Sequence, residues 1–272
     1  MVREIQCNGS PLVMGILNIT PDSFYDGGRY YKIEDAITQA LQMIEDGADI
    51  IDVGGESTRP FSELISVDDE LERVIPVIES IRTHSDIAIS IDTNKAQVAR
   101  EAHLAGADIV NDISGFMFDP DMAATVAKFN IYAVIMHIKG TPKDMQQNPR
   151  YEDVISEIKA FFTERMAFAM KNGVNEERII LDPGIGFGKR VEDNLRIIRQ
   201  LGDFKELGRP ILMGTSMKSF ITHITDSPLH ERVEGTLASI AISVWNGANI
   251  VRVHDVKKAK KVVKLVSAIM SS

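Results

Sequence analysis

Hydrophobic and polar positions along the chain follow two alternating rhythms. Short runs rich in Val, Ile and Leu predict β-strands, and each is followed by a stretch with apolar positions three and four residues apart, which predicts an amphipathic helix. The predicted strands are 12–19, 49–53, 87–91, 108–113, 132–136, 178–181, 210–213 and 250–253. The predicted helices lie near 33–46, 67–84, 95–105, 120–129, 151–172, 191–201, 217–246 and 255–270.

Eight strand–helix units predict an α/β fold. Strands that are apolar on both faces suit either a closed (β/α)₈ TIM barrel or an open doubly wound sheet. The count of eight and the length of 272 residues favour one barrel domain spanning 1–272. The long connections 20–32, 56–66, 139–150 and 214–229 then lie at the C-terminal face of the strands, where barrel enzymes have their active sites.

Composition narrows the class of function. The chain has 30 Lys and Arg against 39 Asp and Glu, and the net charge of −9 argues against a nucleic-acid partner. A single cysteine, Cys7, excludes a disulfide within the chain and suits a reducing compartment. No apolar run approaches the roughly 20 residues of a membrane span, and the first residues contain no apolar signal core. We therefore expect a cytoplasmic protein that does not enter a membrane.

Polar side chains stand at the end of nearly every predicted strand. Asp92, Asn111 and Asp182 follow apolar runs and should be largely buried, where an unpaired carboxylate is costly. We expect a polar ligand with adjacent N–H donors to be their partner. Three other polar residues near strand ends, Asp112, Thr215 and Asp255, are expected to serve in turns or as helix caps.

The same rim has a cationic side. Arg252 and His254 alternate with valines, so both point to one face of the last strand. Phosphate sites in barrels often lie at the loops after strands seven and eight, and Lys218 opens a predicted helix whose N-terminal amides favour anions. Carboxylates facing cations predict a ligand with a donor-rich heterocycle at one end and phosphate at the other.

Three sequence features suggest other kinds of site but do not meet the requirements for them. The run 184–189 has neither the spacing of a nucleotide-binding P-loop nor the third glycine of a dinucleotide fingerprint. His137, His223 and His230 lack metal-ligand spacing, and we expect structural or surface roles for them. Ser216 has no Gly-x-Ser-x-Gly context, which argues against a serine hydrolase.

Several segments resemble the signatures of dihydropteroate synthases. The run 14–28 (MGILNITPDSFYDGG) resembles the first signature and 51–60 (IDVGGESTRP) the second. Further matches are 90–93, 110–115, 136–142, 182–189 and 252–256. Together they extend in order over nearly the whole chain, and the first two are long enough to be highly specific.

The resemblance implies a (β/α)₈ barrel that makes 7,8-dihydropteroate for folate biosynthesis. Enzymes of this family are transferases that join 6-hydroxymethyl-7,8-dihydropterin diphosphate to p-aminobenzoate and release diphosphate, with magnesium. The implied mechanism is dissociative: diphosphate leaves first, and the aromatic amine then attacks a pterin methylene cation. The family is commonly dimeric and is the target of sulfonamides, which mimic aminobenzoate.

The resemblance also implies roles for individual residues. Catalytic roles fall to Asp92, Lys218, Arg252 and His254. Pterin binding is implied for Asp92, Asn111, Met136, Asp182, Phe187, Gly214 and Lys218. Diphosphate binding is implied for Asn18, Thr58, Arg252 and His254, with Asn18 also a magnesium ligand. Aminobenzoate binding is implied for Phe24, Thr58, Arg59, Pro60, Phe187 and Ser219, with the N-terminus of a helix assisting Ser219.

Two positions depart from the family pattern. Met217 stands where an arginine is usual, which removes a planar cation beside the aminobenzoate site, and Phe61 stands where a small residue is usual. One alternative is a pterin-binding methyltransferase domain that works with a corrinoid protein, although a cobalamin-binding motif is missing from the sequence. The other is a catalytically inactive pterin-binding paralogue. The helix 230–246, with the one tryptophan, is either a dimer interface or a core helix.

Overall fold

The computed structural model describes residues 2–7, 9–19, 29–57, 64–226, 228 and 231–272. Within them a single parallel sheet runs in the order β6-β5-β4-β3-β2-β1-β8-β7. A parallel bridge between Leu181 of β6 and Ile211, just before β7, joins the two ends of this order. The strands are β1 (Leu12–Asn18), β2 (Ile50–Gly54), β3 (Ala88–Asp92), β4 (Ile109–Asp112), β5 (Tyr132–Met136), β6 (Ile179–Asp182), β7 (Leu212–Met213) and β8 (Ile250–Val253).

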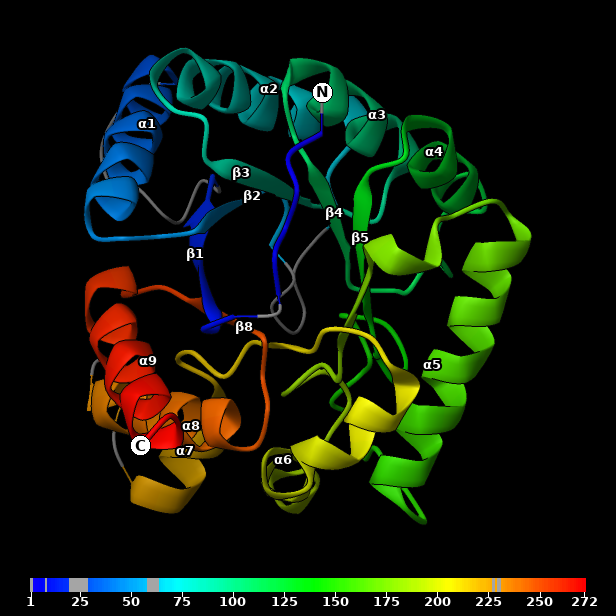
Figure 1. Ribbon diagram of the computed structural model, residues 1–272. Coiled ribbons are helices and arrows are strands. Elements are labelled where there is room, and N and C mark those ends of the chain that lie inside the picture. Colours follow the sequence, from blue (N-terminus) through cyan, green and yellow to red (C-terminus); the bar gives the residue numbers. More distant parts are fainter. Residues whose placement is uncertain (1, 8, 20–28, 58–63, 227, 229–230) are drawn as a thin grey trace.

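The helices form a ring outside the strands, as Figure 1 shows, so the predicted (β/α)₈ barrel is confirmed. Their apolar faces cover the outer side of the sheet and build the main core. No described helix is long and apolar enough to cross a membrane. The helices are α1 (Arg29–Glu45), α2 (Val67–His84), α3 (Ala96–Ala105), α4 (Met122–Phe129), α5 (Val154–Lys171), α6 (Val191–Arg199), α7 (Ser219–Thr225), α8 (Val233–Trp245) and α9 (Val256–Met270), with 3₁₀ turns η2 (Glu176–Arg178) and η3 (Leu201–Leu207).

One predicted helix is wrong. The stretch 217–246 contains two helices, α7 and α8, rather than one. The first ends where Asp226 takes a left-handed conformation, with φ of 54°, and its N–H bonds back to the carbonyl of Thr222. Pro228 follows, and a proline inside a helix lacks the N–H donor and clashes with the preceding turn. Helical periodicity on both sides of this break made it look continuous.

The interior of the barrel has two layers because alternate residues of a strand point inward. The lower layer is apolar and is formed chiefly by Met14, Ile50, Ala88, Ile109, Val134, Ile180, Leu212 and Ile250. Two residues further along, the same inward face carries Asp52, Ser90, Asn111, Asp182 and Arg252. The upper layer is therefore polar.

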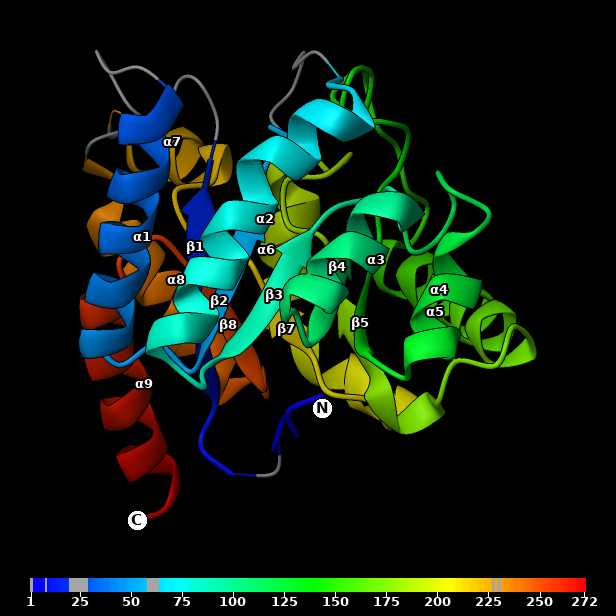
Figure 2. The same ribbon diagram turned by 90° about the horizontal axis from the view of Figure 1, so that it is seen from above.

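The segment before β1 covers the lower end of the barrel. Its backbone bonds to residues at the starts of strands, with Ile5 N donating to the hydroxyl of Tyr132 at 3.3 Å and Asn249 donating to the carbonyl of Cys7 at 3.1 Å. Figure 2 shows this segment and the end of α9 at the same end of the molecule. The polar layer consequently opens only toward the opposite end, where the strands finish.

Candidate active site

A cleft opens above the polar layer, at the C-terminal ends of the strands. It brings together all seven residues that the sequence predicted for pterin binding, and it also includes Arg252. Three further residues, Ile113, Gly184 and Ile185, complete it. The cleft is lined by Asp92, Asn111, Ile113, Met136, Asp182, Gly184, Ile185, Phe187, Gly214, Lys218 and Arg252.

Arg252 lies at the centre of an ion network. Its Nε is 2.5 Å from Oδ2 of Asp52, and its Nη2 is 2.6 Å from Oδ2 of Asp92. The amide of Asn111 donates to the same Asp52 oxygen at 3.1 Å. The side chain of Arg252 remains 18% exposed, so the guanidinium can still be reached from the cleft.

This network corrects two expectations. Asp92 and Asn111 do not depend on a ligand for a partner, because Arg252 and Asp52 bond to them within the chain. Arg252 also lies among the carboxylates and not on a separate cationic side. Asp52, which the sequence analysis did not select, is fully buried and holds both Arg252 and Asn111. The available signal was its position two residues after Ile50 on the inward face of β2.

Burial changes the protonation of these groups. It raises the pKa of Asp92 to about 7, although the attraction of Arg252 opposes the change. Burial also raises the pKa of Asp182, with the N–H of Gly184 opposing it. The pKa of Lys218 falls to about 8 because of burial and of repulsion from Arg252. Burial lowers the pKa of Arg252, but Asp52 and Asp92 outweigh that effect and raise it. Arg252 is therefore the permanent cation of the cleft.

Asp182 and Lys218 face the cleft from neighbouring loops. The N–H of Gly184 donates to Oδ1 of Asp182 at 2.7 Å, which orients the carboxylate at the end of β6. The ammonium of Lys218 lies 4.2 Å from the centre of the Phe187 ring, within cation–π range. An acceptor, a donor and an aromatic face thus surround the same space, as a flat heterocycle with donor and acceptor edges requires.

A buried lysine ties the loops after β5 and β6 together. The Nζ of Lys189 lies 2.9 Å from Nδ1 of His137 and donates to the carbonyls of His137 and Phe187. Burial lowers the pKa of Lys189 to about 7 and holds that of His137 well below its ordinary value. His137 thus has a structural partner, as expected. Gly184 belongs to the same junction, and two facts favour glycine at this position. Its φ is +70°, and a Cβ there would lie 2.1 Å from the carbonyl oxygen of His137.

The other described residues that were predicted to bind diphosphate, aminobenzoate or magnesium lie at or after the C-terminal ends of β1, β7 and β8. Nδ1 of His254 is 2.9 Å from the hydroxyl of Ser216. Ser219 is exposed at the start of α7, which has only seven residues, so the expected helix dipole there is a short one. Asn18 Oδ1 and Asp92 Oδ2 lie 3.5 and 3.9 Å from the point that a Cβ of Gly54 would occupy.

The oxygens of Asn18 and Asp92 fit magnesium chemistry. Mg²⁺ prefers hard oxygen ligands and commonly takes one or two from the protein, with the rest from substrate phosphates and water. Over the described part of the chain, no three His, Cys, Asp or Glu side chains gather as a self-sufficient metal cage. A magnesium ion bound here would therefore need a phosphate-bearing ligand to complete its coordination.

Several predicted residues lie outside the described ranges: Phe24, Thr58, Arg59, Pro60, Phe61 and His230. Met217, the departure from the family pattern, is described. It has φ of +59°, and its sulfur lies 3.9 Å from the hydroxyl of Thr236 on α8. Its carbonyl accepts from Arg232 at 2.7 Å. The thioether therefore packs against α8.

The expected turn and cap residues are confirmed. Asp112 accepts from the N–H groups of Ser114 and Phe116, within the turn after β4. Asp255 caps α9 by accepting from the N–H of Lys258. The hydroxyl of Thr215 accepts from Ser239 at 2.9 Å, in the turn after β7.

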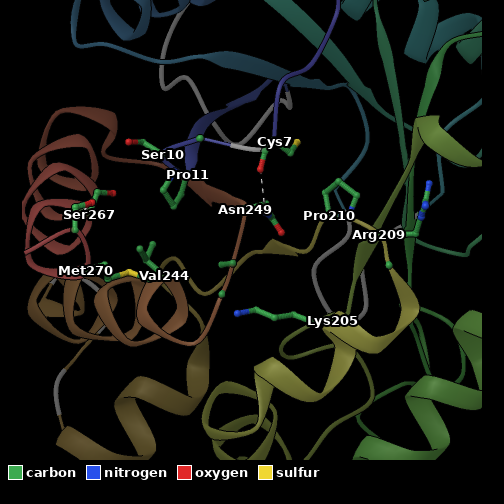
Figure 3. Close-up of a pocket in the computed structure, with 15 residues that line it drawn as sticks. Cys7, Ser10, Pro11, Lys205, Arg209, Pro210, Val244, Asn249, Ser267 and Met270 are labelled. Carbon is green, nitrogen blue, oxygen red and sulfur yellow. Dashed lines mark hydrogen bonds between the residues drawn. The ribbon is translucent and has the colours of Figure 1, made fainter.

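A larger cavity of about 490 Å³ lies at the opposite end of the barrel (Figure 3). Cys7, Lys205, Arg209 and Asn249 are among the residues that line it, with no Asp, Glu or His in the described lining. Burial raises the pKa of the Cys7 thiol to about 11, so it is not a nucleophile at neutral pH. We assign the active site to the smaller cleft because acids, bases and an aromatic face converge there.

Comparison with known proteins agrees with this assignment. Residues 14–254 match the family described as pterin binding enzyme. A dihydropteroate synthase of Synechocystis is 50% identical over 258 residues, which cover 94% of this chain and 89% of that protein. The dihydropteroate synthase of Yersinia pestis, solved with a sulfonamide drug, has a TM-score of 0.93 and 38% identity, covering 98% and 97% of the two chains. That of Xanthomonas albilineans, solved with 7,8-dihydropteroate, has a TM-score of 0.89 and 36% identity, covering 98% and 96%.

Proposed function

The chain belongs to the dihydropteroate synthases of the pterin-binding enzyme family, and from this membership we propose how its cleft performs the reaction. The enzyme is a transferase that joins 6-hydroxymethyl-7,8-dihydropterin diphosphate to p-aminobenzoate, giving 7,8-dihydropteroate and diphosphate. The observation that carries the proposal is the convergence of Asp182, Lys218, Asn111 and Phe187 in one cleft beside Arg252.

The pterin is recognised by its edges and its face. One carboxylate can accept two adjacent N–H groups, so Asp182 takes the ring N–H and the exocyclic amine of the pterin together. Lys218 donates to its carbonyl oxygen and ring nitrogen from the other side, and Asn111 completes the edge. Met136 and Phe187 supply apolar contact, and Gly214 leaves room for the ring.

The diphosphate end is bound by Arg252, His254, Asn18 and Thr58. A guanidinium has five N–H donors, and the hydrogen bonds to Asp52 and Asp92 leave others for phosphate oxygens. Magnesium, held by Asn18 beside Asp92, would stabilise negative charge on the departing diphosphate. Arg252 stabilises the same charge, and a cation aimed at developing charge typically contributes the largest share of such catalysis.

The chemical step breaks the C–O bond to diphosphate before the new C–N bond forms. The resulting pterin methylene cation is positive, and the negative form of Asp92 offsets that charge. The amine of p-aminobenzoate then attacks the methylene carbon and loses one proton to the medium. No strong base is required, because an aniline nitrogen is already nucleophilic. We place aminobenzoate among Phe24, Thr58, Arg59, Pro60, Phe187 and Ser219.

The two alternatives predict a different ligand in one case and no turnover in the other. A methyltransferase domain would bind a pterin without diphosphate and would have no use for the Arg252 network at the rim. An inactive paralogue would bind pterin without turnover. The sequence similarity to named dihydropteroate synthases extends over nearly the whole chain, and it favours the synthase over both alternatives.

We also propose a cytoplasmic homodimer of single-domain chains. The helix α8 is not simply a core helix. One face buries Ile240 and Val244, while Ile242 is 50% and Trp245 57% exposed. Leu195 of the neighbouring α6 is 42% exposed. Such apolar side chains on adjacent helices suit a second copy of the chain. Sedimentation velocity of the protein and of Trp245→Arg tests this, and a wild-type monomer at micromolar concentration would refute it.

The reaction is tested by coupled detection of diphosphate. Purified protein receives pterin diphosphate, p-aminobenzoate and magnesium, and dihydropteroate is identified by mass spectrometry. Product that requires both substrates supports the synthase. Pterin binding without product would favour the inactive paralogue, and a protein that binds no pterin would refute the site assignment.

A further inference from the structure

A second ion cluster lies behind the cleft, away from the reacting groups. The ammonium of Lys95, at the start of α3, is 2.8 Å from Oε2 of Glu56 and 2.5 Å from Oε2 of Glu70. The Glu70 side chain is fully buried, that of Glu56 is 7% exposed and that of Lys95 is 17% exposed. Two buried carboxylates therefore share one cation, and removal of the cation leaves both without compensation.

The cluster holds both ends of the connection between β2 and α2. While Oε2 of Glu56 is bound by Lys95, its Oε1 accepts from the N–H of Ile65 at 3.0 Å. These two residues lie nine positions apart, on the two sides of the segment 58–63. Arg73 of α2 also donates to the carbonyl of Gly55, at 2.8 Å. Glu56 is thus a clamp on the connection, and Lys95 fixes the orientation of the clamp.

The clamp lies close to the pterin cleft. A Cβ on Gly54 would lie 3.6 Å from Cβ of Asp92, and a Cβ on Gly55 would lie 3.0 Å from Cγ of Glu70. The backbone at Gly54 and Gly55 is therefore packed closely between the cleft carboxylate and the ion cluster. A change in the cluster would therefore act first on the start of the connection, at Gly55 and Glu56.

We propose that Lys95 is a positioning residue for the second substrate, acting through Glu56 to hold the base of the 56–66 connection at the rim of the cleft. The inference rests on the proposed function, in which Thr58, Arg59 and Pro60 of this connection contact p-aminobenzoate. Lys95 is not among the described residues that line the cleft. Of the proposed pterin residues, Asp92 on β3 adjoins the clamp and is held separately by Arg252, while the others lie on β4, β5 and β6 and in the loops after β6 and β7.

The test is a comparison of Michaelis constants in Lys95→Met, Lys95→Arg and Glu56→Gln. Lys95→Met should raise the KM for p-aminobenzoate about tenfold or more, because small displacements of positioning groups cost that much. Its Kd for 6-hydroxymethylpterin, measured by calorimetry, should stay within about twofold of the wild-type value. A twofold change in Kd corresponds to less than half of the change in binding free energy that a tenfold change in Kd represents. Lys95→Arg, which keeps the cation, should restore part of the KM, and Glu56→Gln should resemble Lys95→Met.

The matched control is Lys159→Met. Lys159 also has a 2.5 Å ion pair, with Glu206, but that pair is on the outside of the barrel. It should leave both constants unchanged. If Lys95→Met does not fold, Lys95→Met/Glu70→Gln removes the tie without leaving the same excess of buried charge, and it should show the same selective rise in KM.

An unchanged KM for p-aminobenzoate in folded Lys95→Met, or an equal loss of pterin and aminobenzoate binding, would overturn the proposal. A rise in KM that Lys95→Arg does not reverse at all would also count against it, because the role rests on the cation. Wild-type protein without synthase activity would instead refute the proposed function.

Discussion

Gly184 offers the sharpest test of how the fold builds the pterin site. It lies just after β6, has φ of +70° and donates its N–H to Asp182. A Cβ at this position would lie 2.1 Å from the carbonyl oxygen of His137. Gly184→Ala should therefore both destabilise the protein and displace the Asp182 carboxylate, which we propose binds the pterin.

The size of the effect follows from two contributions. An L-residue at this φ costs about 1–2 kcal/mol because of its own backbone. The overlap with a backbone carbonyl forces a movement of roughly 1 Å, and overpacking of this kind costs about 1–3 kcal/mol more. Gly208→Ala is the matched control, because Gly208 has φ of +68° and nothing within 4 Å of its Cβ position. Gly208→Ala should therefore lose stability through the backbone contribution alone.

Two measurements separate these contributions. In thermal unfolding, the Tm of Gly184→Ala should be lower than that of Gly208→Ala by at least about 2–4 °C. This is the shift in Tm expected for about 1 kcal/mol in a protein of this size. The kcat/KM for pterin diphosphate should fall by up to about 100-fold in Gly184→Ala and stay at the wild-type value in Gly208→Ala. Equal stability of the two variants, or normal pterin kinetics in Gly184→Ala, would refute the reasoning.

Three further predictions concern single side chains of the site. Arg252→Ala should lower turnover about 100-fold or more, as loss of a charge-stabilising donor does, while calorimetry still detects pterin without diphosphate; equal loss of both would contradict the placement of the anion site. Met217→Arg should chiefly change the KM for p-aminobenzoate in steady-state assays, and an unchanged KM would show that position 217 does not shape that pocket. The kcat/KM for pterin diphosphate should fall above pH of about 8, because the buried Lys218, whose pKa is about 8, then loses the proton that makes it a cationic donor. Lys218→Arg should move that fall to higher pH, and a pH profile identical to wild type would exclude Lys218 as its cause.

The sequence predicts the barrel well because its signal is local. The residue pattern that predicts each strand or helix is contained within a few residues, and eight strand–helix repeats are compatible with few folds of this length. Polar residues at strand ends were found for the same reason. The exception at 217–246 is instructive, because amphipathic periodicity continues across a break that Pro228 and the left-handed Asp226 impose.

Pairing within the site could not be read from the sequence. Arg252 and Asp52 are 200 positions apart, and nothing local indicates that they share a hydrogen bond. Lys95 and Glu56 are 39 positions apart and belong to different connections. Arg252 and Asp52 meet because β8 and β2 pair with β1 from its two sides, and Lys95 and Glu56 meet because β2 and β3 are neighbours in the sheet. The sequence thus shows which side chains reach the rim, while the three-dimensional fold decides which of them neutralise one another.

The bonds of Arg252 to Asp52 and Asp92 bear on how the enzyme completes a cycle. A diphosphate that arrives at this guanidinium meets two carboxylates already beside it. It binds the N–H groups that they leave free, and its net gain in free energy is smaller than that of an anion meeting a bare cation. When the product anion departs, the same carboxylates remain to compensate the charge. An arginine held in this way favours release of an anion over its retention, which suits the proposed role of Arg252 in binding diphosphate and releasing it in every turnover.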